Sequence, residues 1–227
     1  MQGWRALALI CMRGNNRKVF YFIKEIIVNL DFYNEVGRLK RMPRTGWVQR
    51  EIPNPETVAE HMYRSQFIVY DFAKATKEDP QSCVVMMMLH DLQETRAGDI
   101  TPHCGISKAE KAAREFKAAQ ELAELSGNPE FFKVFREYEG RKTKRAQLCG
   151  DADQCECLTQ ALEYATLYPA KRELLENFWP YAYKKLNTSV GLAFFDQLYA
   201  RKSELYAPSR DSVQALVAVG YAKAQNG

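Results

Sequence analysis

Signals that start and stop helices divide much of this chain, and they constrain its fold more than any other feature. Asn54-Pro55 and Asp79-Pro80 each place a capping side chain before a proline, a pattern typical of the first turn of a helix. Gly98 is typical of the residue at which a helix ends. Helices are therefore predicted over about residues 54–76 and 79–98.

The rest of the chain carries further signals of the same kind. Ser107 and Glu110 form a capping box, Asn128-Pro129 opens another helix, and Pro169 ends a long one. The additional predicted helices cover about 107–127, 128 onward, 143–167, 170–178, 188–205 and 210–224. No alternation of apolar and polar residues with a period of two has a useful length, and no repeat interrupts the chain. We therefore predict one all-α domain.

Composition and charge limit the classes of protein to which the chain can belong. Its 227 residues fit one domain, and 46% hydrophobic and 26% charged residues are ordinary for a soluble globular protein. A net charge of +4 permits anionic ligands without indicating a nucleic-acid surface, and the basic run 141–145 is interpreted as a solvated helix start. No apolar stretch approaches the ~20 residues that span a bilayer. We expect no nucleic-acid partner and no membrane partner.

The cysteines bear on the cellular compartment. The six cysteines, at positions 11, 83, 104, 149, 155 and 157, do not form a spaced framework. No second pair of Cys or His residues stands at a spacing that suits zinc. Reduced thiols in a cytoplasmic protein are therefore the expected state.

The most unusual residues are His90 and Asp91, which follow an apolar run in the second predicted helix. His61 lies on the apolar face of the preceding helix, and Asp151 and Asp153 follow farther along the chain. Two imidazoles with two carboxylates would form a nitrogen and oxygen ligand set suited to a divalent transition metal. Each residue has an ordinary alternative, as a core histidine or as a solvent-facing helical carboxylate. The residues alone leave open which aspartate would join the set.

Three segments, in a consistent order, resemble a known family. The passage 90–102 (HDLQETRAGDITP) resembles the motif of HD-domain phosphohydrolases, and residues 39–73 and 151–164 are similar to segments of the 5'-deoxynucleotidase-like HD family. The similarity covers roughly residues 30–200. It implies a single HD-domain helical bundle and a metal-dependent hydrolase that removes the 5'-phosphate of nucleoside monophosphates, with deoxynucleotides favoured.

The resemblance also suggests domain limits. We divide the chain into an N-terminal extension (1–28), an HD domain (29–206) and a C-terminal helical tail (207–227). The extension lies outside the resemblance, so it is a targeting segment, an addition to the fold or a misassigned start.

The resemblance implies four metal ligands, His61, His90, Asp91 and Asp153, the last being the second aspartate of Asp-Ala-Asp. Glu94 lies one helical turn after His90, so its carboxylate would share the site without binding the metal. In that place it would orient and deprotonate the attacking water. The ordinary alternative for Glu94 is an exposed helical residue.

The resemblance further implies that Asp99 reads a sugar hydroxyl, although Asp99 would also suit a turn-capping role. Related nucleotidases carry an Arg-Trp pair before the first metal histidine, whereas this chain has Thr45-Gly46-Trp47. Trp47 would either stack on a base or serve as a core aromatic residue. The departure at Gly46 leaves substrate preference more open than reaction type.

The arginine that this departure removes has several possible replacements. Arg44 and Arg50 lie nearby in the sequence, and Arg64 lies one turn beyond His61. We take Arg44, Arg50 and Thr101, together with Asp99 and Trp47, as candidate substrate-binding residues.

The histidine count limits the metal stoichiometry. The chain has three histidines, so only His103 remains once His61 and His90 are used. That disfavours a second histidine-rich ion site, and with it the cyclic-dinucleotide phosphodiesterases and di-iron oxygenases of the same superfamily. We expect one divalent metal per chain, Mn²⁺ or Co²⁺.

The family commonly forms homodimers, and the aromatic segment 178–183 would contribute an interface or pack internally. Two rival functions stay open. One is an HD-fold oxygenase or phosphatase that acts on another small organophosphorus compound. The other is a non-catalytic helical binding protein.

Overall fold

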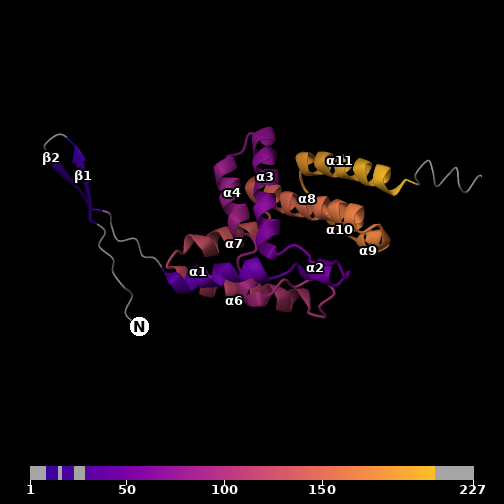
Figure 1. Ribbon diagram of the computed structural model, residues 1–227, viewed down its shortest axis with the longest axis horizontal. Coiled ribbons are helices and arrows are strands. Elements are labelled where there is room, and N and C mark those ends of the chain that lie inside the picture. The colour runs from indigo at the N-terminus through magenta and orange to yellow at the C-terminus, as the bar shows by residue number, and fades with distance from the viewer. Residues whose placement is uncertain (1–8, 15–16, 23–28, 208–227) are drawn as a thin grey trace, which may run out of the picture.

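The computed structural model describes residues 9–14, 17–22 and 29–207 (Figure 1). Over 29–207 the regular elements are helical, which confirms the predicted all-α domain, and the predicted helix over 210–224 lies outside the described residues. None of the described helices has the length and apolar character needed to cross a membrane. In chain order the helical elements are α1 (Leu30–Val36), η1 (Gly37–Arg41), α2 (Thr45–Val48), α3 (Val58–Thr76), α4 (Pro80–Leu89), α5 (Glu94–Ala97), α6 (Lys108–Ser126), α7 (Glu130–Gly140), α8 (Lys144–Leu167), η2 (Pro169–Lys171), α9 (Arg172–Leu175), α10 (Phe178–Tyr183) and α11 (Ser189–Tyr206).

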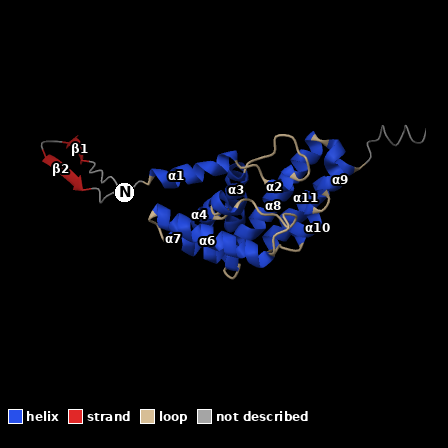
Figure 2. Ribbon diagram, turned by 90° about the horizontal axis from the view of Figure 1, so that it is seen from below, coloured by secondary structure: helices blue, strands red, loops and turns tan. Residues whose placement is uncertain are grey.

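A two-stranded antiparallel hairpin precedes the helices, and the expectation of a chain without strands was wrong there. Strands β1 (Leu9–Gly14) and β2 (Arg17–Phe22), red in Figure 2, pair with Leu9 opposite Phe22 and Gly14 opposite Arg17. Each strand is only 6 residues long, so any alternation is too short to recognise. The Gly-Asn-Asn sequence between the apolar runs is, in retrospect, a hairpin signal.

Helix α8 forms the centre of the domain. It packs against α3, α4, α7, α10 and α11, and most of its residues are buried (Figure 1). The buried residues of α8 include alanine, leucine and cysteine, together with polar residues such as Asp151, Glu156 and Gln160, which need partners inside the domain. The main core cluster joins α3, α4 and α8 through residues such as Val69, Phe72, Met86, Met87 and Leu148. The helices that carry the candidate ligands are therefore fixed in one tightly packed core.

Helix α3 begins three residues later than Asn54-Pro55 predicted. Its N-cap is Thr57, which forms a reciprocal capping box with Glu60. Residues before the cap are held extended, because the Arg44 amide donates to the Glu56 carbonyl and the Val58 amide to the Met42 carbonyl, both at 2.9 Å. This pairing brings the segment around Arg44 to the start of α3.

The predicted helix over 79–98 is broken at His90. Helix α4 ends at Leu89, residues 90–93 form a tight turn, and α5 begins at Glu94. In this turn the Leu92 amide donates to the Leu89 carbonyl and the Glu94 amide to the Asp91 carbonyl, an i to i+3 pattern. A regular helix would turn neighbouring side chains about 100° apart. Here His90 and Asp91 nevertheless reach the same site, with His90 Nε2 lying 3.2 Å from Asp91 Oδ2.

The segment predicted as one helix over 170–178 is instead a series of short pieces, η2, α9 and α10. In contrast, the predicted helix over 143–167 is confirmed by α8, with Thr143 as its N-cap, and that over 188–205 by α11, with Thr188 as its N-cap. Ser107 caps α6 as predicted, although Glu110 pairs with Arg114 and does not complete the capping box.

Candidate metal centre and adjoining pocket

Polar atoms of His61, His90, Asp91 and Asp153 converge in the interior, at the junction of α3, α4 and α8. His61 Nε2 lies 3.2 Å from Asp153 Oδ1, 3.6 Å from Asp91 Oδ2 and 3.3 Å from His90 Nε2. His90 Nε2 lies 3.2 Å from Asp91 Oδ2. Both histidines are fully buried. The structure thus brings together the four side chains that the sequence analysis selected as ligands.

The separations among His61, His90 and Asp91, whose ligand atoms all lie within 4.8 Å of one another, suit a single cation, and Asp153 adjoins this group through its contact with His61 Nε2. Ligand atoms that each lie about 2.0–2.2 Å from one ion are roughly 3.0–3.5 Å from each other. Moreover, each imidazole uses its Nδ1 elsewhere: His90 Nδ1 donates to the Met87 carbonyl at 2.7 Å, and His61 Nδ1 donates to Glu156. With Nδ1 of each ring engaged outside the cluster, Nε2 is the nitrogen that each ring directs toward its centre, where a cation would bind it.

Glu156 is a site residue that the sequence analysis missed. Its carboxylate, fully buried in α8, accepts from His61 through Oε2 and from Arg64 through Oε1, at 2.9 and 2.7 Å from Nε and Nη2. Carboxylates that hold a ligand imidazole in this way fix its orientation and increase its basicity. Glu156 follows Asp153 by three residues on a helix, which places both on one face and was the available signal. Arg64, another candidate for the missing arginine, is therefore bound to Glu156 behind the cluster.

Electrostatics in the cluster favour a cation. Although burial opposes ionisation, His90 and Arg44 keep the pKa of Asp91 below its usual range, and His61 and His90 keep that of Asp153 well below it. Burial and the charges of Asp91 and Asp99 raise the pKa of Glu94 well above its usual range. Glu94 is 4% exposed, and its Oε2 has no hydrogen-bond partner within the described residues. A buried, unpaired carboxyl oxygen beside this cluster is suited to contact a bound water or ligand.

Asp151 is turned away from the cluster. It is fully buried, and its carboxylate accepts from the Asn187 amide at 2.9 Å, the Thr188 amide at 2.7 Å and the Thr188 hydroxyl at 2.6 Å. Gly191 makes room for it, because a Cβ at that position would collide with the Asp151 carboxylate. Asp151 therefore ties the start of α11 to α8, whereas Asp153 faces the histidines.

We accordingly expect Asp151→Ala to lower stability and to leave metal binding intact. The substitution removes the acceptor of three hydrogen bonds, so the free energy of unfolding should fall by about 1–3 kcal/mol. Urea titration and metal analysis of the refolded protein measure the two effects separately. Asp153→Ala is the matched control and should show the reverse pattern. Loss of metal from Asp151→Ala at unchanged stability would contradict this assignment.

A pocket of about 380 Å³ opens beside the cluster, and Asp91, Glu94 and Asp153 form part of its wall. Its lining also includes all five residues predicted to bind substrate: Arg44, Trp47, Arg50, Asp99 and Thr101. His103, the histidine that remains outside the proposed ligand set, contributes to its rim as an exposed side chain. Phe178 and Tyr181 of α10 line the pocket as well. The sequence alone indicated only an interface or internal packing for this aromatic segment.

Among the candidate arginines, Arg44 lies nearest the cluster. Its Nη1 donates to Asp91 Oδ2 at 3.2 Å, and its Nε lies 4.0 Å from Asp99 Oδ2. Arg50 donates to the Gly46 carbonyl at 3.3 Å, and its guanidinium lies 4.7 Å from the centre of the Phe178 ring. Arg44 is thus placed to meet an anion at the cluster, and Arg50 lies farther along the pocket wall.

Trp47 and Asp99 have structural partners of their own. The indole of Trp47 is 1% exposed, stacks on Phe178 at 4.4 Å and donates from Nε1 to Glu56 at 2.9 Å. Of the two roles considered for Trp47, these contacts are those of a core aromatic residue that supports the pocket. Asp99 Oδ2 accepts from the Thr45 amide at 2.7 Å, at the start of α2, rather than capping the turn that follows it.

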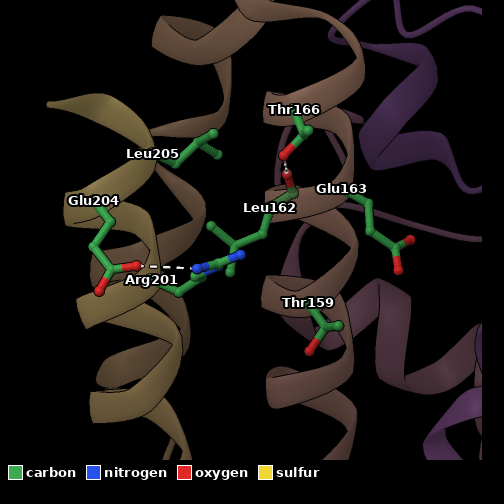
Figure 3. Close-up of a pocket in the computed structure, with 7 residues that line it drawn as sticks. All are labelled: Thr159, Leu162, Glu163, Thr166, Arg201, Glu204 and Leu205. Atoms are coloured by element: carbon green, nitrogen blue, oxygen red, sulfur yellow. Dashed lines mark hydrogen bonds and ion pairs between the residues drawn. The ribbon is translucent and has the colours of Figure 1, made fainter. Parts of the chain in front are cut away.

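A separate hollow of about 430 Å³ lies between α8 and α11 (Figure 3). It is lined by Thr159, Leu162, Glu163, Thr166, Arg201, Glu204 and Leu205. Arg201 pairs with Glu204 along α11 at 3.1 Å, and Glu163 pairs with Arg64 on the far side of α8. The charges of this hollow are thus satisfied locally, and no histidine contributes to it.

Comparison with known proteins identifies relatives that match most of this chain. A family model described as "HD domain" matches residues 36–190. The human protein "5'-deoxynucleotidase HDDC2" is 34% identical over 177 residues, which cover 77% of this chain and 86% of the human protein. The fission yeast protein "5'-deoxynucleotidase hdd1" is 33% identical, with 65% of this chain and 78% of that protein covered.

Solved structures of other proteins share this helical fold. A conserved hypothetical protein from Pyrococcus furiosus superposes with a TM-score of 0.64 at 28% identity, covering 75% of this chain and 99% of its own. The PH0347 protein from Pyrococcus horikoshii has the same TM-score at 27% identity and covers 75% of this chain and 96% of its own. The family match over 36–190 includes the helices that carry the four clustered side chains.

Proposed function

This chain belongs to the HD-domain family, and on that premise we propose that it is a hydrolase that removes the 5'-phosphate of nucleoside monophosphates. Deoxynucleotides are the proposed preferred substrates, in line with the names of its relatives. The observation that carries the proposal is the placement of Arg44 and the unpaired Glu94 beside the His61, His90, Asp91 and Asp153 cluster, at one end of an open pocket.

We propose that the four clustered side chains hold one divalent cation, Mn²⁺ or Co²⁺, since mixed imidazole and carboxylate ligands suit both. A cation bound there would polarise the phosphoryl group and lower the pKa of a coordinated water. Glu156 and the Met87 carbonyl hold the two imidazoles ready for it. The histidine count argues for one such ion per chain, and metal analysis measures the number directly.

The remaining roles follow from charge and position. The Arg44 guanidinium would bind a phosphate oxygen and stabilise the charge that develops as the P–O5' bond breaks. Once a bound cation offsets the burial and the negative charges that raise the pKa of Glu94, its carboxylate would accept the proton of the attacking water, because it is the carboxyl group beside the cluster that lacks a full set of partners. Asp99 would accept from the sugar 3'-hydroxyl, with the aromatic wall of Phe178 and Tyr181 beyond it.

A phosphate-release screen tests the proposal. The metal-free protein would be supplied in turn with Mn²⁺, Co²⁺ or Fe²⁺ and offered each deoxy- and ribonucleoside 5'-monophosphate, with 3'-monophosphates as the matched control. We expect metal-dependent release from the 5' compounds and little from the 3' isomers. No release from any 5'-monophosphate would refute the proposal. Two irons per chain with oxygen consumption would indicate the oxygenase, and nucleotide binding without turnover the binding protein.

The sugar contact gives a separate prediction. Asp99→Ala should reduce kcat/KM by roughly tenfold to a hundredfold on a 2'-deoxynucleotide, because a hydrogen bond worth about 1–3 kcal/mol is lost. A 2',3'-dideoxynucleotide lacks the hydroxyl and should suffer only the smaller loss that comes from freeing the Thr45 amide. Equal fractional losses on the two substrates would make Asp99 a structural residue.

We further propose a homodimer in the cytoplasm. Tyr63, Phe67 and Tyr70 form an exposed aromatic stripe along α3, at 66%, 58% and 47% exposure, which supports self-association. The five cysteines whose side chains the structure describes are free thiols, in line with a reducing compartment. Sedimentation of the purified protein tests the first of these proposals.

A further inference from the structure

Tyr138, near the end of α7, contacts two of the four clustered side chains. Its hydroxyl donates to Asp153 Oδ2 at 3.1 Å. Its ring lies edge-on to the imidazole of His90, with 5.3 Å between ring centres and 62° between the planes. The side chain is 3% exposed. One buried residue therefore links the ligand supplied by α8 to the ligand at the end of α4.

The two oxygens of Asp153 have different surroundings. Oδ1 faces the cluster, 3.2 Å from His61 Nε2, whereas Oδ2 accepts from Tyr138 and, at 3.0 Å, from the amide of Gln154. Bonds to Oδ2 fix the rotation of the carboxylate and so the direction of Oδ1. Gln154 is the next residue on the same helix and is partly exposed, so Tyr138 supplies the restraint that comes from a separate, buried helix.

Tyr138 is itself held in place. Arg141, the C-cap residue of α7, places its guanidinium 3.6 Å from the centre of the Tyr138 ring. The same guanidinium donates to the Ala146 carbonyl at 3.1 Å. Gly150 makes this approach possible, because a Cβ there would collide with the guanidinium. A carboxylate oxygen can only accept, so the Tyr138 hydroxyl is the donor of its bond to Asp153. The basic run at 141–145 thus contributes one arginine to the interior.

We propose that Tyr138 is a positioning residue that orients Asp153 for the divalent cation and thereby sets the metal affinity of the site. The inference rests on the proposed metal-dependent function. It concerns a residue outside the motif segments 39–73, 90–102 and 151–164, whose role only the packing of α7 on α8 reveals.

Tyr138→Phe tests the inference, because it keeps the ring against His90 and Arg141 and removes only the hydroxyl. Loss of a hydrogen-bonding partner of a metal ligand typically weakens metal binding by about 10–100-fold. We expect a shift of this size in the Co²⁺ dissociation constant, measured by competition with a chromophoric chelator. The melting temperature of the metal-free protein should fall by only about 2–4 °C, as for one lost hydrogen bond.

Tyr164→Phe is the matched control. Tyr164 is also buried, at 5% exposure, and its hydroxyl accepts from the Glu56 amide at 2.8 Å. This variant should show a similar small change in melting temperature with an unchanged Co²⁺ affinity. Equal Co²⁺ affinities for the parent and both variants would overturn the role of Tyr138. Failure of the nucleotidase proposal would appear separately, as a parent protein that binds Co²⁺ but releases no phosphate.

Discussion

His90→Ala should lose tightly bound metal and, with it, nearly all phosphate release. His90 supplies one of two imidazole nitrogens in the cluster, and its Nε2 lies within 3.3 Å of both His61 Nε2 and Asp91 Oδ2. Loss of a mere partner of a metal ligand costs about 10–100-fold in metal affinity or activity, so loss of the ligand itself should exceed a hundredfold. Elemental analysis after dialysis and a phosphate assay at saturating metal measure the two effects.

His103→Ala is the appropriate control for metal content. His103 is the remaining histidine of the chain and is exposed at the rim of the pocket, so its removal should leave a full equivalent of metal in place. A full equivalent of tightly bound metal in His90→Ala would show that the four-residue assignment is wrong. Loss of metal from His103→Ala would enlarge the ligand set.

Glu94→Gln should keep its metal and its fold while turnover falls by roughly 10²–10⁴-fold, the usual contribution of a positioned general base. The amide has nearly the same shape as the carboxyl group but cannot accept a proton. Since Glu94 Oε2 has no partner among the described residues, the substitution breaks no hydrogen bond of that oxygen. Single-turnover phosphate release at saturating nucleotide, compared with metal content, separates the chemical step from metal loss.

Glu115→Gln offers a matched comparison, because Glu115 is another buried carboxyl group, at 5% exposure, that pairs with Lys111 at 3.2 Å and does not line the pocket. This change should affect stability more than turnover. If Glu94→Gln lost metal and activity together, Glu94 would belong among the metal ligands. If it retained full turnover, another group would have to accept the proton.

The sequence predicted the all-α domain because capping residues, prolines and glycines act over a few residues and leave a local record. Thr143, Thr188 and Ser107 cap helices where the pattern placed them. Where a longer-range contact competes, the local signal failed: Asn54-Pro55 looks like a helix start, yet residues 56 and 58 pair with residues 44 and 42, and the helix begins only after Thr57. The hairpin at 9–22 was missed because its strands are too short to show a period.

The residues of the candidate site likewise fall into those that were predicted and those that were missed. His61, His90, Asp91 and Asp153 were selected as ligands because the family resemblance implied them, and they meet in the structure. Glu156 and Tyr138 were not selected, because the contacts that matter join residues 95 and 15 positions apart in the chain. The choice between Asp151 and Asp153 also depended on a distant partner, the start of α11, which no local pattern reveals.

Three acidic residues within six positions of α8 perform three separate tasks. Asp151 anchors α11, Asp153 enters the cluster, and Glu156 holds His61. A deletion or insertion of one residue in this stretch would rotate everything beyond it by about 100° and break all three arrangements at once. This short segment therefore cannot tolerate a change of length. The packing of α11 on α8 and the arrangement of the clustered side chains would be lost together.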